Sequence, residues 1–180
     1  MEALSKTPKT RSNLQRRGRK SVKVFISHSH RDASFTKLLC DFLTTSELVK
    51  EEIRCTSVPK HGYTLGRDVE EAIRKDIGKA KIVIGFFTKD SLKSSNVLLE
   101  LGAGWGLGKI LIPILGPRVK ASDLPEWIQG GHRMAWTHRE CWEEFEKIFR
   151  DDLGKPLVDK GRFNKMIDKL VKWQPKPPRP

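Results

Sequence analysis

Short apolar runs, rich in β-branched and aromatic residues, constrain the fold of this chain most strongly. Each run has the length of a buried strand, and the stretches between the runs carry apolar residues at helical spacing. The expected strands are SVKVFIS (21–27), EIRCTSV (52–58), KIVIGFFT (81–88), KILIPIL (109–115) and a weaker HRMAWT (132–137). The expected helices cover residues 32–46, 69–77, 95–108, 139–153 and 162–173. This alternation predicts an α/β fold with a flavodoxin-like, doubly wound, five-stranded parallel sheet and helices on both faces.

The positive charge of the chain is concentrated at its two ends. The net charge is +13, and residues 1–20 hold seven Lys or Arg against one acid, which gives +6. Residues 169–180 hold four Lys or Arg and no acid, which gives +4. We therefore expect a disordered basic tail over 1–20, a folded domain over 21–153, and a C-terminal helix with a Pro-rich basic tail over 154–180. The N-terminal stretch has no aromatic residue for base stacking, so its charge does not favour a nucleic-acid partner.

Other bulk features narrow the class of protein. No apolar run approaches the length of a membrane span, and the N-terminus has no apolar signal-peptide region. The three cysteines, Cys40, Cys55 and Cys141, are an odd number without a C-x-x-C pair. This usage argues against a disulfide framework or a zinc cluster and fits a reducing cytoplasm.

The segment SHSHRD (27–32) follows the first strand and raises the question of a functional loop. In a doubly wound sheet, ligands bind at the carboxyl ends of the strands where the winding reverses. With a flavodoxin-like order this crevice lies between the first and third strands. Its walls are expected to be residues 27–32, 57–66 and 88–96. Asp32 is expected to cap the helix that follows.

Several motif interpretations of these loops fail on spacing. His28 and His30 are two residues apart, with no acidic or cysteine partner at a recognisable spacing, so no metal site is expected. No G-x-x-x-x-G-K-[ST] loop and no G-x-S-x-G elbow is present. The run GAGWGLG (102–108) precedes a strand and has Leu107 in place of the third glycine of a dinucleotide-binding motif. Its glycines are expected to allow close packing and to end a helix.

Glu100 is the unusual charged residue of the chain. It lies in NVLLELGAGW, among apolar residues and glycines, on the helix that follows the third strand. From a cap at Ser94 or Ser95, it falls in the second turn, near the crevice. A lone carboxylate in such a setting is costly unless it is paired or functional. On spacing alone, a partner arginine, an exposed edge and a catalytic role remain open.

Four segments in order resemble a Toll/interleukin-1 receptor (TIR) domain of the bacterial kind. They are VFISHSHRD, IRCTSVPKHGYTLGRDVEEAI, IVIGFFTKDSLKSSNVLLELGAGWGLGK and ILIPIL, and the resemblance covers residues 22–116 and extends toward 150. It implies the TIR fold, with a BB loop over 57–66. In members that cleave NAD+, the glutamate of the third helix is catalytic, and it matches Glu100.

The resemblance implies an NAD+ glycohydrolase or cyclase that acts in bacterial defence signalling. Cleavage of the nicotinamide–ribose bond expels a neutral leaving group, so one carboxylate beside the oxocarbenium-like ribose suffices. Whether Glu100 acts electrostatically or as a nucleophile, and whether hydrolysis or cyclisation follows, stays open. NAD+ is then a substrate, and no cofactor and no metal are expected. The expected substrate-binding residues are Phe25, Ser27, His28, Ser29, Arg31, Ser57, Pro59, Lys60, Gly62, Ser95 and Asn96.

One departure from the family pattern concerns the pocket wall. Many NAD-cleaving members carry Trp four residues before the glutamate, where this chain has Asn96. Trp105 and Tyr63 are candidate substitutes, although Trp105 is expected to belong to the core.

Two alternatives remain beside the enzyme. One is a non-catalytic TIR interaction module, and the other is a nucleoside-processing enzyme of the deoxyribosyltransferase-like kind. The resemblance also implies self-association through the BB loop, from Pro59 to Gly66. No other segment of the sequence resembles a sensor domain, so the trigger is expected to be a separate protein, a small molecule or the protein concentration.

Overall fold

The computed structural model describes residues 21–55, 69–129 and 133–175. These form a five-stranded sheet with the order β2-β1-β3-β4-β5, and every neighbouring pair is parallel. The strands are β1 (Val24–Ser27), β2 (Ile53–Cys55), β3 (Ile82–Phe87), β4 (Ile110–Leu115) and β5 (Met134–Ala135). The predicted doubly wound parallel sheet is therefore confirmed, and β1, β3 and β4 are each somewhat shorter than the predicted strand.

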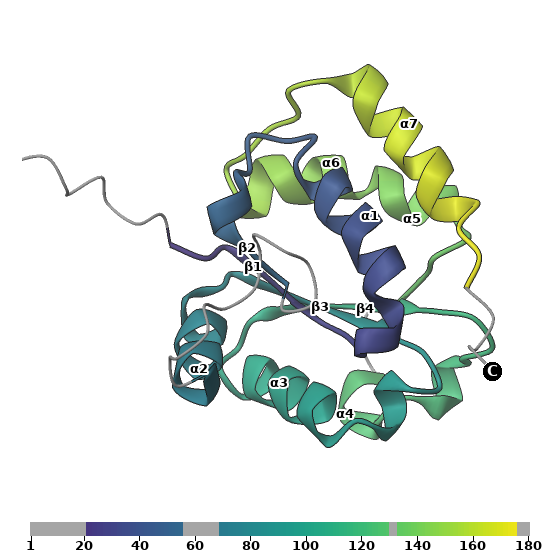
Figure 1. Ribbon diagram of the computed structural model, residues 1–180. Coiled ribbons are helices and arrows are strands. Elements are labelled where there is room, and N and C mark those ends of the chain that lie inside the picture. The colour runs from purple at the N-terminus through teal and green to yellow at the C-terminus, as the bar shows by residue number, and fades with distance from the viewer. Residues whose placement is uncertain (1–20, 56–68, 130–132, 176–180) are drawn as a thin grey trace, which may run out of the picture.

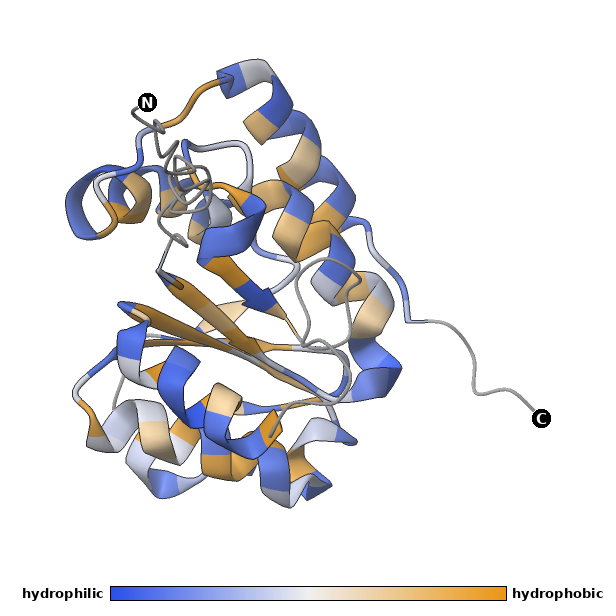
Figure 2. Cartoon of the chain, turned by 60° about the vertical axis from the view of Figure 1, so that its left-hand side comes forward, coloured by the Kyte–Doolittle hydropathy of each residue, from blue (hydrophilic) through white to orange (hydrophobic). Residues whose placement is uncertain are grey.

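Helices cover both faces of the sheet (Figure 1). On one face lie α1 (Ala33–Leu43), α5 (Arg139–Glu143), α6 (Phe145–Lys147) and α7 (Lys160–Val171). On the other lie α2 (Val69–Lys79), α3 (Ser95–Gly106) and α4 (Glu126–Gln129). Short 3-10 turns precede several of these elements: η1 (His30–Asp32), η2 (Lys50–Glu52), η3 (Ser91–Lys93) and η4 (Ala121–Asp123). The strands are apolar while the outer helix faces are polar, as expected for a sheet buried on both sides (Figure 2).

The sheet separates two hydrophobic clusters. The larger one joins α1, α5, α6 and α7 through stacked and edge-on aromatic rings. Phe42 of α1 packs on four of them: Trp142, Phe145, Phe149 and Phe163. The smaller cluster lies under α2, α3 and α4 and includes Phe25, Val83 and Leu101.

The C-terminal helix belongs to the larger cluster. Phe163, Met166, Ile167 and Leu170 of α7 are buried in it, and α7 packs along α1. We predicted 154–180 as a separate C-terminal part. The structure places its helical portion in the same core as the sheet, while the boundary of the functional domain stays a prediction.

The prediction of one continuous α-helix over 139–153 is wrong. The chain forms α5 and α6 and then a π-helical turn, η5 (Ile148–Asp152). The apolar spacing still serves its purpose, because Trp142, Phe145 and Phe149 are all buried against α1.

Candidate active site at the carboxyl ends of β1 and β3

The site is centred where the winding of the sheet reverses. The chain passes from β1 to β2 on one side and returns to β3 on the other, so the carboxyl end of β1 lies between two crossovers. Ser27, the last residue of β1, pairs in register with Gly85 of β3. Such reversal points are where open parallel sheets bind ligands.

Glu100 reaches this point from α3. The Ser27 hydroxyl donates a hydrogen bond to Glu100 Oε2 at 2.5 Å, and Ser27 is fully buried while Glu100 is half-buried. The sequence left a partner arginine open, but the structure gives Glu100 a serine. Its carboxylate is therefore held in place without a neutralising cation at hydrogen-bond distance among the described residues.

The packing of α3 explains why Glu100 points to β1. The Ser94 hydroxyl accepts a hydrogen bond from Val97 N, which starts the helix as predicted. Val97, Leu101 and Gly104 face the sheet. A Cβ on Gly104 would stand 3.0 Å from Val83 Cγ2, and one on Gly85 would stand 2.9 Å from Leu101 Cδ2. The missing side chains thus allow α3 to lie close against β3.

Burial raises the pKa of Glu100, and this effect exceeds the opposing ones. The hydrogen bond from Ser27 lowers the pKa, and so does the nearby His28 ring. A carboxylate that is partly desolvated yet anchored interacts strongly with positive charge that develops beside it.

His28 lies next to Ser27 and faces β2. Its Nδ1 is 3.4 Å from the Ile26 carbonyl oxygen. Cys55 Sγ lies 4.0 Å from Nδ1 and 3.9 Å from Nε2. The pair forms because Ile26 and Cys55 are register partners in β1 and β2. His28 is largely buried beside a thiol, and its expected contact with substrate stays a prediction.

Asp32 corrects one expectation. It occupies the N-cap position of α1, but its side chain makes no capping hydrogen bond. Its carboxylate instead accepts a hydrogen bond from the Thr88 hydroxyl at 2.8 Å, at the end of β3. Burial raises the pKa of Asp32 to about 6. Asp32 therefore ties the loop after β1 to the loop after β3.

The remaining predicted residues of the first loop lie at its surface. Ser29 accepts a hydrogen bond from Arg31 N at 3.4 Å, and the exposed Arg31 pairs with Asp90 at 3.2 Å. Exposed ion pairs of this kind are weak, so the Arg31 guanidinium can exchange Asp90 for another anion. Ser95 and Asn96 are exposed in the first turn of α3.

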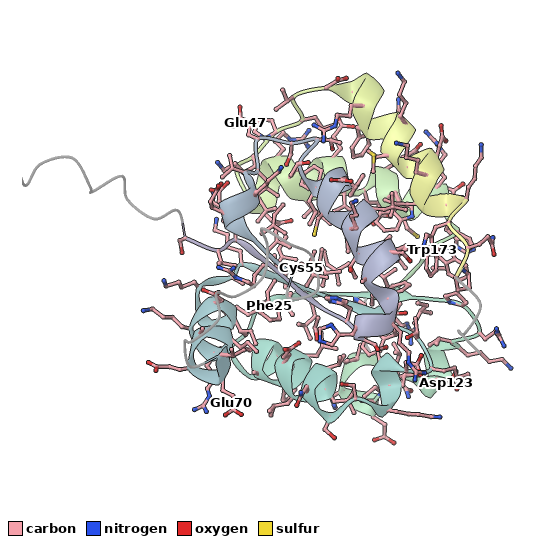
Figure 3. All side chains as sticks on the ribbon, in the orientation of Figure 1. Phe25, Glu47, Cys55, Glu70, Asp123 and Trp173 are labelled. Atoms are coloured by element: carbon pink, nitrogen blue, oxygen red, sulfur yellow. The ribbon has the colours of Figure 1, made fainter. Side chains whose placement is uncertain are left out.

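Two expectations do not fit the structure. Phe25 is fully buried in the smaller cluster and cannot contact a ligand with its side chain (Figure 3). It alternates with Val24 and Ile26, which face the other cluster. Trp105 was expected in the core, yet it is 58% exposed with its ring centroid 6.0 Å from that of Trp127. Gly104 takes the sheet-facing position, and the next helical residue consequently points outward.

Ser57, Pro59, Lys60 and Gly62, together with the BB loop to Gly66 and Tyr63, lie outside the described residues. Cys55 was not among the predicted site residues, and Thr88 was predicted only as part of the 88–96 wall; they contact His28 and Asp32 from the ends of β2 and β3. Both follow from the rule that led to Ser27, because they too stand where parallel strands end. Among the described residues, no group of three or more His, Cys, Asp or Glu side chains is arranged to hold a metal ion. In the same part of the chain, no helix is both long and apolar enough to cross a membrane.

The sheet order and the site at the winding reversal define a flavodoxin-like α/β protein. Within this class, a family model described as "TIR domain" matches residues 24–149. The chain therefore belongs to the TIR domain family.

Solved structures agree with this assignment. The TIR domain of the Toll-related receptor TRR-2 from Hydra magnipapillata aligns with a TM-score of 0.57 and 18% identity, over 74% of this chain and 99% of that one. A metazoan TIR-STING receptor from C. gigas, solved in complex with 2',3'-cGAMP, aligns with a TM-score of 0.51 and 17% identity, over 83% of this chain and 39% of that one. At these identities the likeness establishes the fold alone.

A curated bacterial protein is similar in sequence over part of its length. The "Uncharacterized protein YddK" of Bacillus subtilis (strain 168) is 31% identical over 83 residues. That match covers 46% of this chain and 31% of YddK, so it spans about a third of the relative.

Proposed function

We propose that this TIR domain cleaves the nicotinamide–ribose bond of NAD+, with Glu100 as the catalytic carboxylate. The observation that carries the proposal is the hydrogen bond from Ser27 to Glu100 at the reversal point of the sheet. A carboxylate anchored by a neutral donor is not neutralised by a salt bridge, so its charge is available to the substrate whenever Glu100 is ionised. The membership of the TIR family supports the proposal, since that family includes NAD-cleaving enzymes.

Cleavage of the nicotinamide–ribose bond requires little more from the protein than the negative charge of Glu100. Nicotinamide leaves as a neutral base from a cationic pyridinium, so no side chain needs to donate a proton to it. Positive charge then develops on the ribose, and the nearby Glu100 carboxylate stabilises it. The Ser27 hydroxyl orients the carboxylate, and its buried position limits the movement of both groups.

The proposed contacts with the rest of the substrate are chosen by where the residues lie around Glu100. Arg31 and Ser29 lie on the loop after β1, and Ser95 and Asn96 begin α3. A guanidinium and hydroxyl groups are suitable donors to a diphosphate or a ribose. Ser57, Pro59, Lys60 and Gly62 stay predicted contacts of the BB loop. A cytoplasmic location and a part in bacterial defence signalling complete the proposal.

Self-association through the BB loop sets the conditions of the test. Purified protein should be incubated with NAD+ over a wide range of protein concentrations, and released nicotinamide should be quantified by chromatography. Release that rises more than linearly with protein concentration supports catalysis in an assembled state. Absence of release at the highest concentration contradicts the proposal. Faster cleavage of simple nucleosides than of NAD+ would indicate a nucleoside-processing enzyme instead.

Exposed apolar side chains favour the second candidate function, a non-catalytic interaction module. Leu99 is 72% exposed, Trp105 58% and Leu107 56%, all on or just after α3. Large exposed apolar side chains are candidate contacts with another protein. Such contacts are also compatible with an enzyme that assembles, so the nicotinamide assay decides between the two.

A further inference from the structure

A buried cluster of titratable groups lies beside Glu100 and is not used in the mechanism above. Cys55 at the end of β2 is fully buried, and Cys40 of α1 is 1% exposed. His28 adjoins both groups, because it follows Ser27 in the chain and its ring lies 3.9 Å from Cys55 Sγ. A thiol–imidazole contact within the interior is the arrangement in which a proton can pass from sulfur to nitrogen.

The contacts of the His28 ring indicate where its protons lie. Nδ1 is near the Ile26 carbonyl, which can only accept, so Nδ1 carries a hydrogen. Cys55 Sγ lies 3.9 Å from Nε2 and 4.0 Å from Nδ1, so it is close to both ring nitrogens. The charge of a ring protonated at both nitrogens would therefore lie within 4.0 Å of the sulfur.

The groups around the pair favour the charged form. Hydrogen bonding to Cys40 contributes most to lowering the pKa of Cys55, against the effect of burial, and His28 and Thr36 lower it further. The same hydrogen bond to Cys55 raises the pKa of Cys40. Burial lowers the pKa of His28, but Cys55, the Ile26 carbonyl and Asp32 together raise it above its ordinary value.

In the described part of the chain, the charged and titratable groups that interact with His28 come from three elements. Asp32 belongs to η1, Cys55 to β2 and Glu100 to α3, and Cys40 of α1 interacts with Cys55. Thr88 and Asp90, in the turn after β3, act on Asp32. Among the described residues, Asp32 and Glu100 interact electrostatically with His28, and their negative charge favours a cation there.

We propose that Cys55 and His28 form a thiolate–imidazolium ion pair next to the candidate active site, and that the His28 cation favours the ionised form of Glu100. His28 is then a positioning residue that acts through Glu100 and does not touch the reacting atoms. The ion pair does not depend on the proposed function, whereas its effect on catalysis rests on the proposed NAD+ cleavage.

The ion pair is tested without any substrate, by the ultraviolet absorbance of the thiolate during a pH titration of the folded chain. An ordinary cysteine ionises near pH 8.5, about two units above an ordinary histidine. We expect one thiolate per chain that persists below about pH 7 and disappears in Cys55→Ser. In His28→Gln, ionisation should move to higher pH. Cys141→Ser removes a half-exposed thiol outside the cluster and should leave the signal unchanged.

Circular dichroism checks that each variant folds. If His28→Gln does not fold, Cys55→Ser alone still tests the ion pair. Thiolate absorbance that appears only above about pH 8 in the folded wild-type protein, or that survives Cys55→Ser, overturns the ion pair.

The effect on Glu100 is tested by the pH profile of nicotinamide release. His28→Gln removes an attraction for the Glu100 anion that exceeds the repulsion by Cys55. The acid limb of the profile should therefore move to higher pH, with a smaller change on the plateau. An unmoved acid limb overturns this part. A thiolate signal without any nicotinamide release leaves the ion pair in place and contradicts the proposed function instead.

Discussion

The hydroxyl of Ser27, at the end of β1, lies 2.5 Å from Oε2 of Glu100 on α3 and donates a hydrogen bond to it. This contact joins residues 73 positions apart at the point where the sheet reverses its winding. Removing the hydroxyl leaves Glu100 in the same place along the chain but without its orienting donor.

We predict that Ser27→Ala lowers kcat for nicotinamide release by about 10- to 100-fold, since hydrogen bonds to charged groups contribute about 1.5–3 kcal/mol. KM should change less, because the serine acts on the carboxylate. Steady-state kinetics measures both. Ser46→Ala is the matched control, since Ser46 is also buried but its hydroxyl bonds to Leu43 O at the far end of α1. Equal losses in the two variants would contradict a specific role for Ser27.

The protonation of Glu100 should shape the pH dependence of the reaction. Burial raises its pKa, and only the ionised form stabilises the ribose cation. We expect activity to fall as the pH drops through a value above the ordinary glutamate range. Because the Ser27 hydrogen bond lowers this pKa, Ser27→Ala should move the acid limb further up. A pH profile of kcat for both proteins measures this, and an acid limb at the ordinary glutamate value would count against the buried carboxylate.

Asp32 predicts a pH dependence of stability. Its pKa is raised to about 6 in the folded state, so the folded state binds the proton more tightly than the unfolded chain. This contribution is fully present below the unfolded pKa of about 4 and is lost as pH rises through about 6. Asp32→Asn keeps a partner for the Thr88 hydroxyl and removes the charge. It should raise the free energy of unfolding at pH 7 by up to about 2 kcal/mol and change little near pH 4.

Urea denaturation of wild type and Asp32→Asn at the two pH values measures the difference. The comparison cancels the titration of groups that do not interact with Asp32. A gain that is the same at both pH values, or a loss at neutral pH, would show that Asp32 is not held in a raised-pKa environment.

The close packing of α3 on β3 gives a prediction with an internal control. A Cβ on Gly104 would stand 3.0 Å from Val83 Cγ2 and 3.3 Å from Leu111 Cδ2. Gly104→Ala should therefore destabilise the protein by about 1–3 kcal/mol, despite the better helix propensity of alanine. Gly102, on the same helix, has no atom within 4 Å of such a Cβ. Gly102→Ala should stabilise by about 0.5–1 kcal/mol.

Thermal or urea unfolding of the two glycine variants tests this packing. Opposite signs are the expected outcome. Equal stabilisation by both would mean that α3 can move away from β3 without cost, and the position of Glu100 would then be less defined than the structure indicates.

The fold could be predicted because β-branched apolar runs alternate with amphipathic segments, and the site followed from the rule for strand ends. Glu100 could be selected as a carboxylate in an apolar helix. Its partner Ser27 could not, because serine, arginine and solvent are equally compatible with that pattern. The Cys55–His28 contact depends on the register of β1 against β2, which pairs Ile26 with Cys55. The identities of Cys55 and His28 do not reveal how β1 and β2 are aligned.

Side-chain choices at helix ends were the least predictable part. Aspartate is a common helix-capping residue, but the Asp32 carboxylate accepts a hydrogen bond from the Thr88 hydroxyl, after β3, and makes no capping hydrogen bond. The predictions for Phe25 and Trp105 failed because each depends on which face of its element the side chain lies. The alternation along β1 puts Phe25 in the core, and Gly104 takes the buried position next to Trp105.

The central claim is that Glu100 is the catalytic carboxylate, and Glu100→Gln tests it most directly. Glutamine has nearly the same shape and can still accept the Ser27 hydrogen bond, so the variant removes charge and little else. The rate of nicotinamide release from NAD+ should fall by about 10³-fold or more. Glu70→Gln, at a highly exposed position on α2, should leave it unchanged. Nicotinamide release that survives Glu100→Gln at the wild-type rate would contradict the account.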